Sequence, residues 1–295
     1  IDPNDLRTDL EYDALGRLRK VWRPDRSKAN QPDTPNLEFV YRVAEGKIVA
    51  VTTKKLTPDG GAQRIAQIEL LDGWLRTRQT QAPGPEGRLI TDTFYDDRGQ
   101  VVRTNAPYSA AGAPETELFG IGTPGNVESQ TRTEYDGLGR KTVERLMVGN
   151  GSQPEQEKWR TTYSYGGGNR TTVTPPQGGV PTTEITNARG EVIERRQHNG
   201  NDVETTRYAY TPAGELASVT DPSGNTWTIT YDLRGRKIRT TDPDKGTTTY
   251  TYDDLDRQTS VTDARGKKVV TVYDGLDRKI ALHETSESGP KLASW

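Results

Sequence analysis

Carboxylates are the residues of this sequence with the clearest capacity for chemistry. Six aspartates each follow a tyrosine at a recurring motif: Asp13, Asp96, Asp136, Asp232, Asp253 and Asp274. Two carboxyl groups at a suitable separation carry out glycoside hydrolysis. An active site, however, is normally one asymmetric constellation, whereas these aspartates hold equivalent places in successive units. We therefore interpret them as residues that cap turns, and we predict no catalytic residue.

Metal and nucleophilic chemistry have little support. The chain has no cysteine and only two histidines, His198 and His283, so a standard zinc site would need carboxylates from elsewhere. No motif supports a Ser-His-Asp triad. Residues 242–246, Asp-Pro-Asp-Lys-Gly, are a poor calcium loop because they lack the later bidentate Glu and carry Pro at the second place. We predict a β-turn there, no metal and no cofactor.

Arginines form the second recurring set, at Arg140, Arg236, Arg257 and Arg278. They could line an anion-binding surface, but acidic residues are interleaved with them. Forty basic and forty-two acidic residues give a net charge of -2. We expect these arginines to pair with Asp or Glu across strands while their stems cover apolar surface. Nucleic acid is not an expected partner.

A 21-residue repeat positions these residues. Tyr210, Tyr231, Tyr252 and Tyr273 are spaced 21 residues apart, and the last three are followed by Asp. A second cluster of turn residues, beginning at Asp221, Asp242 and Asp263, keeps the same period. Looser copies toward the N-terminus bring the total to about eleven units, the poorest being Tyr41 with Gly46 and Leu71-Asp72. The motif residues to which we assign a structural role are Tyr12, Asp13, Gly16, Arg17, Tyr95, Asp96, Gly99, Tyr135, Asp136, Gly139, Arg140, Tyr210, Gly214, Tyr231, Asp232, Gly235, Arg236, Tyr252, Asp253, Asp256, Arg257, Tyr273, Asp274, Asp277 and Arg278.

Each unit is predicted to be a β-hairpin. Residues 227–231, Trp-Thr-Ile-Thr-Tyr, alternate with period two, so their large apolar groups share one face of a strand. The following Asp-x-x-Gly or Asp-x-x-Asp is typical of a turn, and a second β-prone run follows the arginine. A lone hairpin is marginal in water, so the units must pair into a continuous sheet. The predicted fold is therefore all-β, a repetitive antiparallel hairpin array.

Composition agrees with an extended sheet rather than a large globular interior. Only 30% of the residues are hydrophobic and 28% are charged. No apolar run is long enough for a membrane helix. The chain starts at Ile1 without a signal-like segment, so we expect it to be a piece of a longer protein.

We predict one array over residues 1–295, most regular in 206–282. Four stretches rich in Pro, Gly, Ser and Asn interrupt the repeats and are expected to be inserted loops: 23–36, 83–87, 105–126 and 147–156.

The unit Tyr-Asp-x-x-Gly-Arg resembles the YD repeat of the rearrangement-hotspot (Rhs) proteins, of the B and C components of bacterial Tc toxins, and of the teneurins. The best matches begin at Tyr12, Tyr135, Tyr231, Tyr252 and Tyr273, and weaker copies cover nearly the whole chain. The resemblance implies a curved, spiralling sheet that forms part of a β-shell. It implies a scaffold without enzymatic activity, whose partners are the rest of the parent protein and a C-terminal toxin cargo. It also implies a secreted or cell-surface location in a bacterium.

Two further features bear on this expectation. Family members release the cargo at an Asp-Pro-x-Gly-Leu type motif, but the sequences that start at Asp221 and Asp242 lack the Leu and fall in the repeat phase, so we assign no cleavage site. The alternative function is adhesion, in which a glycan or receptor binds aromatic platforms. The candidate platform residues are Trp74, Trp159, Trp227, Tyr208 and Tyr250.

Overall fold

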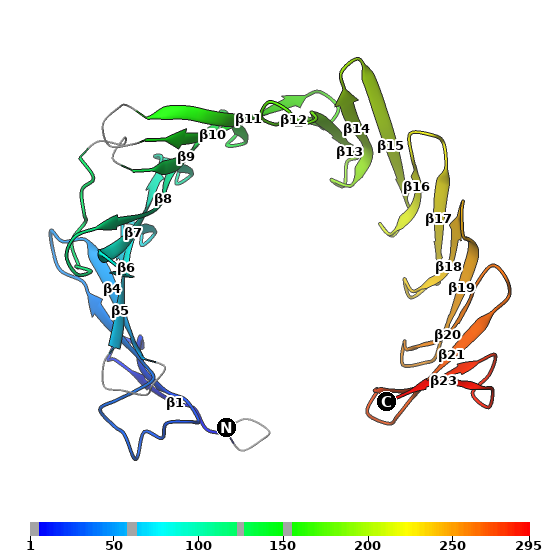
Figure 1. Cartoon of the computed structure of the whole chain (residues 1–295), viewed down its shortest axis with the longest axis horizontal. Helices are drawn as coiled ribbons and strands as arrows, with labels where there is room; N and C mark the ends of the chain where they lie inside the picture. The colour runs from blue at the N-terminus through cyan, green and yellow to red at the C-terminus, as the bar shows by residue number, and fades with distance from the viewer. Residues whose placement is uncertain (1–5, 58–63, 123–126, 150–154) are drawn as a thin grey trace. The chain divides into compact units, whose positions relative to one another are not determined.

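The computed structural model describes residues 6–57, 64–122, 127–149 and 155–295. These residues form 23 β-strands and no helix (Figure 1). Every strand pairing recorded among them is antiparallel, which confirms the predicted all-β hairpin array. The chain divides into two compact units, residues 1–162 and 163–295, which are described separately.

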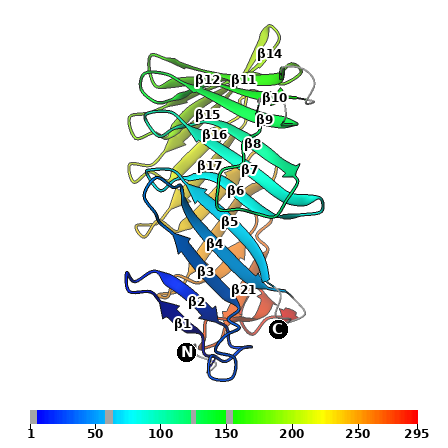
Figure 2. The same cartoon turned by 90° about the vertical axis from the view of Figure 1, so that its left-hand side faces the viewer.

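The first unit is a run of antiparallel strands, each bonded to the next along the chain (Figure 2). Its strands are β1 (Asp9–Tyr12), β2 (Leu18–Trp22), β3 (Leu37–Arg42), β4 (Val49–Leu56), β5 (Arg64–Leu71), β6 (Thr77–Gly84), β7 (Gly87–Tyr95), β8 (Val101–Ala110), β9 (Ser129–Tyr135), β10 (Lys141–Val148) and the first residues of β11 (Gln156–Gly166).

The second unit continues the same pattern of sequential pairing. Its strands after β11 are β12 (Arg170–Thr174), β13 (Thr182–Thr186), β14 (Val192–Asn199), β15 (Asp202–Tyr210), β16 (Leu216–Thr220), β17 (Thr226–Tyr231), β18 (Lys237–Asp242), β19 (Gly246–Tyr252), β20 (Gln258–Thr262), β21 (Lys268–Tyr273), β22 (Lys279–Glu284) and β23 (Lys291–Ser294). In β17 the threonines are exposed while Trp227, Ile229 and Tyr231 are half-buried, as the alternation predicts.

Little of either unit is fully buried. The one cluster of buried apolar residues is small among the described residues and joins Ala50, Ile68 and Leu70 on β4 and β5. Most strand residues elsewhere are half-buried. Cross-strand pairs along the sheet therefore carry much of the stability, since little interior exists to supply it.

The four expected loops have different outcomes. Residues 23–36 do connect β2 to β3, and the Trp22 indole donates to the Gln31 carbonyl at 2.9 Å within this connection. The expectation for 83–87 is wrong. Strand β6 runs to Gly84 and β7 starts at Gly87, and these two residues pair across a tight turn, with Gly87 at a φ of 133°. A two-residue turn of this kind needs no inserted loop.

The two longer loops begin later than expected because the strands extend into them. Residues 105–110 belong to β8, and the irregular segment is 111–122. Residues 147–148 end β10 and Gln156 starts β11. The rest of these expectations, at 123–126 and 150–154, lies outside the described residues.

Candidate functional site

The repeated motif folds as a closed three-residue turn. In the first copy the Asp13 N–H donates to the Arg17 carbonyl at 2.9 Å, and the Gly16 N–H donates to the Asp13 carbonyl at 3.0 Å. Gly16 has a φ of 76°, the conformation that follows a type I turn in a three-residue hairpin loop. The Asp13 carboxylate caps the loop by accepting from the N–H groups of Leu15 and Arg17, both at 2.9 Å. Its other oxygen accepts from Arg17 Nε at 2.7 Å.

The same turn recurs along both units. The same two backbone hydrogen bonds form in the turns whose first residue is Asp72, Asp96, Asp136, Asn187, Thr211, Asp232, Asp253 or Asp274. The tyrosine of each full motif ends a strand, and the arginine, where present, closes the loop just before the next strand. The residue with positive φ is Gly at Gly16, Gly99, Gly139, Gly190, Gly214 and Gly235.

The copy at Leu71-Asp72 is one of the poorest by sequence, yet its turn is regular. The turn at Asp72, where Leu71 replaces the tyrosine, has the full set of contacts: Asp72 accepts from the N–H groups of Trp74 and Arg76 and from Arg76 Nε. Leu75 takes the glycine position with a φ of 61°. The signal that identifies this copy is an Asp followed four residues later by an Arg, independent of the preceding aromatic residue.

Two copies carry aspartate at the glycine position. Asp256 and Asp277 both have a φ of 63°. The Asp256 carboxylate pairs with Arg236 at 2.7 Å, and the Asp277 carboxylate pairs with Arg257 at 2.7 Å. In each case the arginine comes from the preceding repeat. Asp–Arg pairing is thus of two kinds, one inside the turns that have both residues and one from Arg236 and Arg257 to the aspartate of the following turn.

The motif tyrosine bonds to the preceding repeat. The Tyr252 hydroxyl donates to the Lys237 carbonyl at 2.8 Å, and the Tyr273 hydroxyl donates to the Gln258 carbonyl at 3.0 Å. Lys237 is the residue that pairs with Tyr231, at a point where the strand register shifts by one residue. The equivalent bonds elsewhere join Tyr41 to Leu18, Tyr95 to Thr77, Tyr135 to Val101, Tyr210 to Val192 and Tyr231 to Leu216.

Each of these acceptors sits beside such a register shift, where a β-bulge disturbs the regular ladder. The tyrosine of one repeat therefore supplies a donor at the bulge of the repeat before it. Tyr12, which is 52% exposed, makes no such bond within the described residues.

The motif arginine also contacts the tyrosine ring of the following repeat. The guanidinium of Arg257 lies 4.9 Å from the centre of the Tyr273 ring, and Arg236 is 4.9 Å from that of Tyr252. Arg76 lies 4.1 Å from the Tyr95 ring. A guanidinium over an aromatic face is attracted by the ring quadrupole. One arginine thus joins the aspartate of its own turn to the tyrosine of the next.

The capping contacts lower carboxyl pKa values. The Arg17 N–H is the main cause that holds the pKa of Asp13 below its ordinary value; desolvation opposes it, and the Arg17 guanidinium adds a further lowering contribution. The Arg140 and Arg278 N–H groups lower the pKa of Asp136 and of Asp274 in the same way. These carboxylates are held in the charged form that accepts hydrogen bonds, which is the state a cap requires.

Comparison with solved structures gives the same architecture. The chain is similar to the structure titled TcdB2-TccC3, with a TM-score of 0.75 and 18% identity over 98% of this chain. It is also similar to the Photorhabdus luminescens Tc holotoxin pore carrying the TccC3 mutation D651A, with a TM-score of 0.59 and 19% identity over 81% of this chain. In sequence, the RHS Repeat family matches residues 210–247 and 231–268. Residues 210–268 therefore carry RHS repeats.

The chain spans a small part of the structures it matches. It covers 17% of the TcdB2-TccC3 chain and 13% of the holotoxin chain. At these identities the likeness shows the fold alone. A search among curated proteins found no match.

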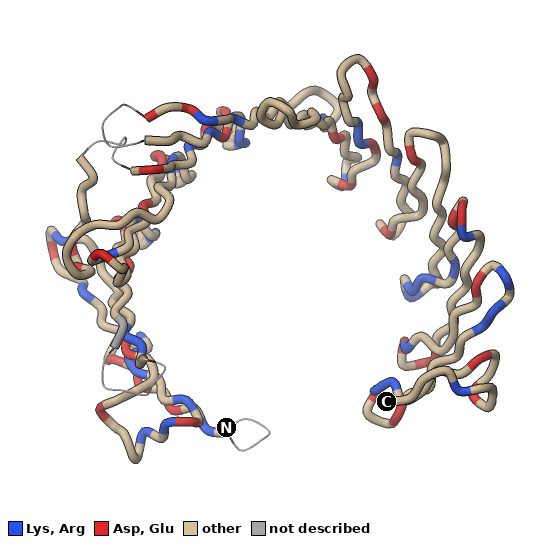
Figure 3. The backbone as a smooth tube through the Cα atoms, in the orientation of Figure 1, with Lys and Arg blue, Asp and Glu red and all other residues tan. Residues whose placement is uncertain are grey.

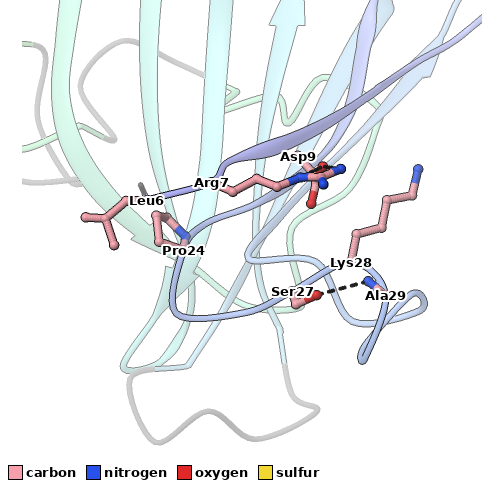
Figure 4. A pocket seen from close by; sticks show the side chains of 7 residues that line it. All are labelled: Leu6, Arg7, Asp9, Pro24, Ser27, Lys28 and Ala29. Carbon is pink, nitrogen blue, oxygen red and sulfur yellow. Dashed lines mark hydrogen bonds and ion pairs between the residues drawn. The ribbon is translucent and has the colours of Figure 1, made fainter. Parts of the chain in front are cut away.

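Two other features of the described residues are a cavity near β1 and the segment at Asp242. A cavity of about 470 Å³ near the start of β1 is lined by Leu6, Arg7, Pro24, Lys28 and their neighbours (Figure 4). Two of its charged groups, Arg7 and Asp9, pair at 2.7 Å, the third, Lys28, lies 3.3 Å from the Glu11 carboxylate, and Ser27 Oγ accepts from the Ala29 N–H. No group of three or more His, Asp or Glu side chains among the described residues is arranged to hold a metal ion.

The Asp242 segment forms the turn between β18 and β19. The Asp242 carboxylate accepts from the N–H groups of Asp244 and Lys245 at 2.9 and 3.0 Å, and Gly246 has a φ of 77°. The Oδ1 atom of Asp242 is therefore occupied by the backbone of its own turn. No helix in the described part of the chain is long and apolar enough to cross a membrane.

Proposed function

We propose that this chain is a single YD-repeat array, 1–295, that forms part of the wall of a shell enclosing a toxin cargo. In this proposal the array does no catalysis, and the motif residues act structurally. The partners are the rest of the parent protein and its cargo, and the location is outside the producing cell or on its surface.

The inter-repeat contacts carry this proposal. In seven copies a tyrosine hydroxyl bonds at the bulge of the previous repeat, and in several copies an arginine contacts the tyrosine of the next. Because these contacts join consecutive repeats at equivalent positions, they hold successive hairpins in the same arrangement, as a continuous wall requires. Lys, Arg, Asp and Glu are mixed along each unit (Figure 3), without the one-sign surface that would attract nucleic acid.

Structural likeness adds support for the shell. The similar structures bear titles that name TcdB2-TccC3 complexes and a Tc holotoxin, and one is described as lacking a hypervariable C-terminal region. These structures share a fold with this chain. The mechanism we propose is steric, because a hydrogen-bonded sheet excludes proteases from what lies behind it.

The test uses the parent polypeptide that contains this chain. We expect limited trypsin digestion to leave the cargo intact while isolated cargo is degraded, and we expect electron microscopy to show a closed particle. A matched variant, Tyr231→Ala, Tyr252→Ala and Tyr273→Ala together, removes three inter-repeat bonds and should open the cargo to trypsin. Cargo in the unaltered protein that is cut as fast as free cargo would rule out the shell.

Glycan binding, the alternative, has weaker support in the arrangement of the aromatic residues. Trp159, Trp227, Tyr208 and Tyr250 are half-buried on the sheet. Trp74 is exposed at 66%, but the Arg76 guanidinium lies 4.5 Å from the centre of its ring. We therefore do not propose an adhesive function.

A further inference from the structure

The first unit has a segment that covers one face of its own sheet. We call residues 111–122, which follow β8, the strap. The strap belongs to no strand, yet it lies over residues of β3, β6 and β7 (Figure 1). Its start is packed closely, because a Cβ on Gly87 would come within 2.6 Å of the Ala110 carbonyl oxygen and 2.9 Å of the Gly112 nitrogen.

Two buried glutamines hold the strap by its backbone. Gln79 and Gln81 on β6 are 1% and 0% exposed. Gln81 Oε1 accepts from the Glu115 N–H at 2.9 Å, and its Nε2 donates to the Glu117 carbonyl at 2.9 Å. Gln79 Oε1 accepts from the Phe119 N–H at 2.9 Å, and its Nε2 donates to the Phe119 carbonyl at 3.0 Å. The side-chain amides thus replace the backbone partners that a neighbouring strand would offer.

The remaining bonds of these amides fix their orientation. Gln79 Nε2 also donates to the Asp92 carboxylate at 2.8 Å, and Gln81 Nε2 donates to Gln79 Oε1 at 2.8 Å. Asp92 is itself 2% exposed and accepts from Asn105 and Tyr108 at 2.9 and 2.8 Å. Because Asp92 can only accept when ionised, it turns the Gln79 nitrogen inward and leaves the oxygen for Phe119. The face is organised to present alternating acceptors and donors.

Basic residues flank the amides. Arg88 donates to the Ala113 carbonyl at 3.2 Å and lies 3.6 Å from the Glu115 carboxylate. Arg42 donates to the Thr116 carbonyl and pairs with Glu117 at 2.8 Å, where Lys47 approaches to 3.5 Å. The strap side chains at both pairs are acidic, so the charges are complementary.

Such burial needs a compensating ligand. A buried amide without hydrogen bonds destabilises the fold, and the outward-facing bonds of both glutamines go to strap backbone. We propose that the face formed by Arg42, Gln79, Gln81 and Arg88 is a peptide-binding site. Its ligand class is an irregular peptide with acidic residues at alternate positions, and the chain's own strap is its resident occupant.

The test separates ligand from site within the full chain. Residues 112–121 are replaced by a Gly/Ser linker of equal length, and a labelled synthetic peptide with the sequence of 112–121 is added. We expect saturable binding by fluorescence anisotropy to the linker variant and none to the unaltered chain, whose site is filled. Adding Gln79→Leu and Gln81→Leu to the linker variant should weaken binding roughly tenfold or more.

Two controls make the result specific. Gln67→Leu removes an exposed amide from the neighbouring strand β5 and should leave binding unchanged. A peptide with lysine in place of both glutamates should bind more weakly, because it meets Arg42 and Arg88 with like charge. Equal binding to the double-leucine variant and to the linker variant would overturn the proposal.

Hydrogen exchange gives a readout that survives failure of the linker variant to fold. In the unaltered chain the Glu115 and Phe119 amides should exchange slowly, since each donates to a buried glutamine. Gln79→Leu and Gln81→Leu should speed that exchange, whereas Gln67→Leu should not. Exchange at the rate of open peptide in the unaltered chain would refute the site.

Discussion

At the scale of single residues, the tyrosine hydroxyl has the most specific task in the repeat. Its ring lies on the half-buried face of a strand, and its hydroxyl reaches the carbonyl beside a bulge in the preceding repeat. Burial raises the pKa of Tyr231 and of Tyr252, so these hydroxyls stay protonated and able to donate. Phenylalanine would fill the same space without the donor.

Replacing Tyr252 by Phe should lower stability by about 1 kcal/mol, the usual value of one intramolecular hydrogen bond. The physical reason is that the Lys237 carbonyl loses its partner while the packing of the ring is kept. Urea unfolding of the two proteins measures the difference. Tyr12→Phe is the matched control, since the Tyr12 hydroxyl bonds to nothing in the described residues. Equal losses at both positions would contradict the role assigned to the bond.

The capping aspartates make stability depend on pH. Their pKa values in the folded chain lie below the ordinary value of 3.8, so the unfolded chain binds more protons near that pH. The stability they contribute is complete above the unfolded pKa and is lost as pH falls through the lower folded values. We expect Tm to drop steeply below about pH 4.

Asp13→Asn, Asp136→Asn and Asp274→Asn together should make that drop shallower. Asparagine keeps an oxygen for the backbone N–H groups, as Asn187 does in its own turn, but it does not titrate. Thermal unfolding followed from pH 7 to pH 3 gives the comparison. Glu45→Gln, at an exposed carboxylate that does not occupy the capping position of a turn, serves as the control. An unchanged pH profile in the triple variant would show that these caps do not set it.

At the scale of the element, the hairpin turn tolerates several sequences because its backbone has only two requirements. It needs a side chain that caps at the first place and a residue that accepts positive φ at the fourth. Asp, Asn and Thr meet the first need at Asp232, Asn187 and Thr211. Gly, Asp and Leu meet the second at Gly235, Asp256 and Leu75.

Asp256 should separate backbone strain from ion pairing. Asp256→Gly loses the pairs with Arg234 and Arg236 but relaxes the left-handed backbone, so we expect a small net change. Asp256→Ala loses the pairs and keeps the strain, and it should be less stable than Asp256→Gly by about 1 kcal/mol. Gly235→Ala, at the same place in the preceding turn, should cost a similar amount. Chemical denaturation of the three variants tests the order, and an alanine variant as stable as the glycine variant would contradict it.

The elements most readily predicted were those whose signal is local. Alternation around Trp227 and the Asp-x-x-Gly turns are encoded within one hairpin, and the all-β array followed from them. The acceptors of the tyrosine hydroxyls lie 15 to 34 residues away, and nothing near the tyrosine specifies them. The turn at Asp72 was underrated because its strand ends in Leu71.

Insertions were the least predictable elements. Pro and Gly at 83–87 are typical of a loop, but the strand register continues through them to a tight turn. The sequence does not predict that the strap packs on the sheet, because its partners, Gln79 and Gln81, have the polarity of surface residues. Only the structure shows that they are buried.

At the scale of the molecule, the 21-residue period sets which side chains share a face. Two strands and two turns return the chain to the same phase, so Tyr231, Tyr252 and Tyr273 end strands on the same side of the second unit. A sheet with so little buried interior depends on this phase. A shift by one residue would exchange the threonine face for the aromatic face along a whole strand.

Removing one complete period should therefore preserve the fold. Deleting residues 237–257 joins Arg236 to Gln258, so that Gln258 takes the place of Lys237 and Tyr273 can still donate to the Gln258 carbonyl. Deleting residues 237–256 removes one residue fewer and puts β20 out of phase with β17. We expect the first variant to unfold in one cooperative transition with Tm within about 5 °C of the parent, since each repeat contacts only its neighbours. The second should melt at a clearly lower temperature, because its apolar side chains meet the polar face of β17. Circular dichroism during heating measures both, and equal melting of the two deletions would mean that the phase of the repeat does not hold this sheet together.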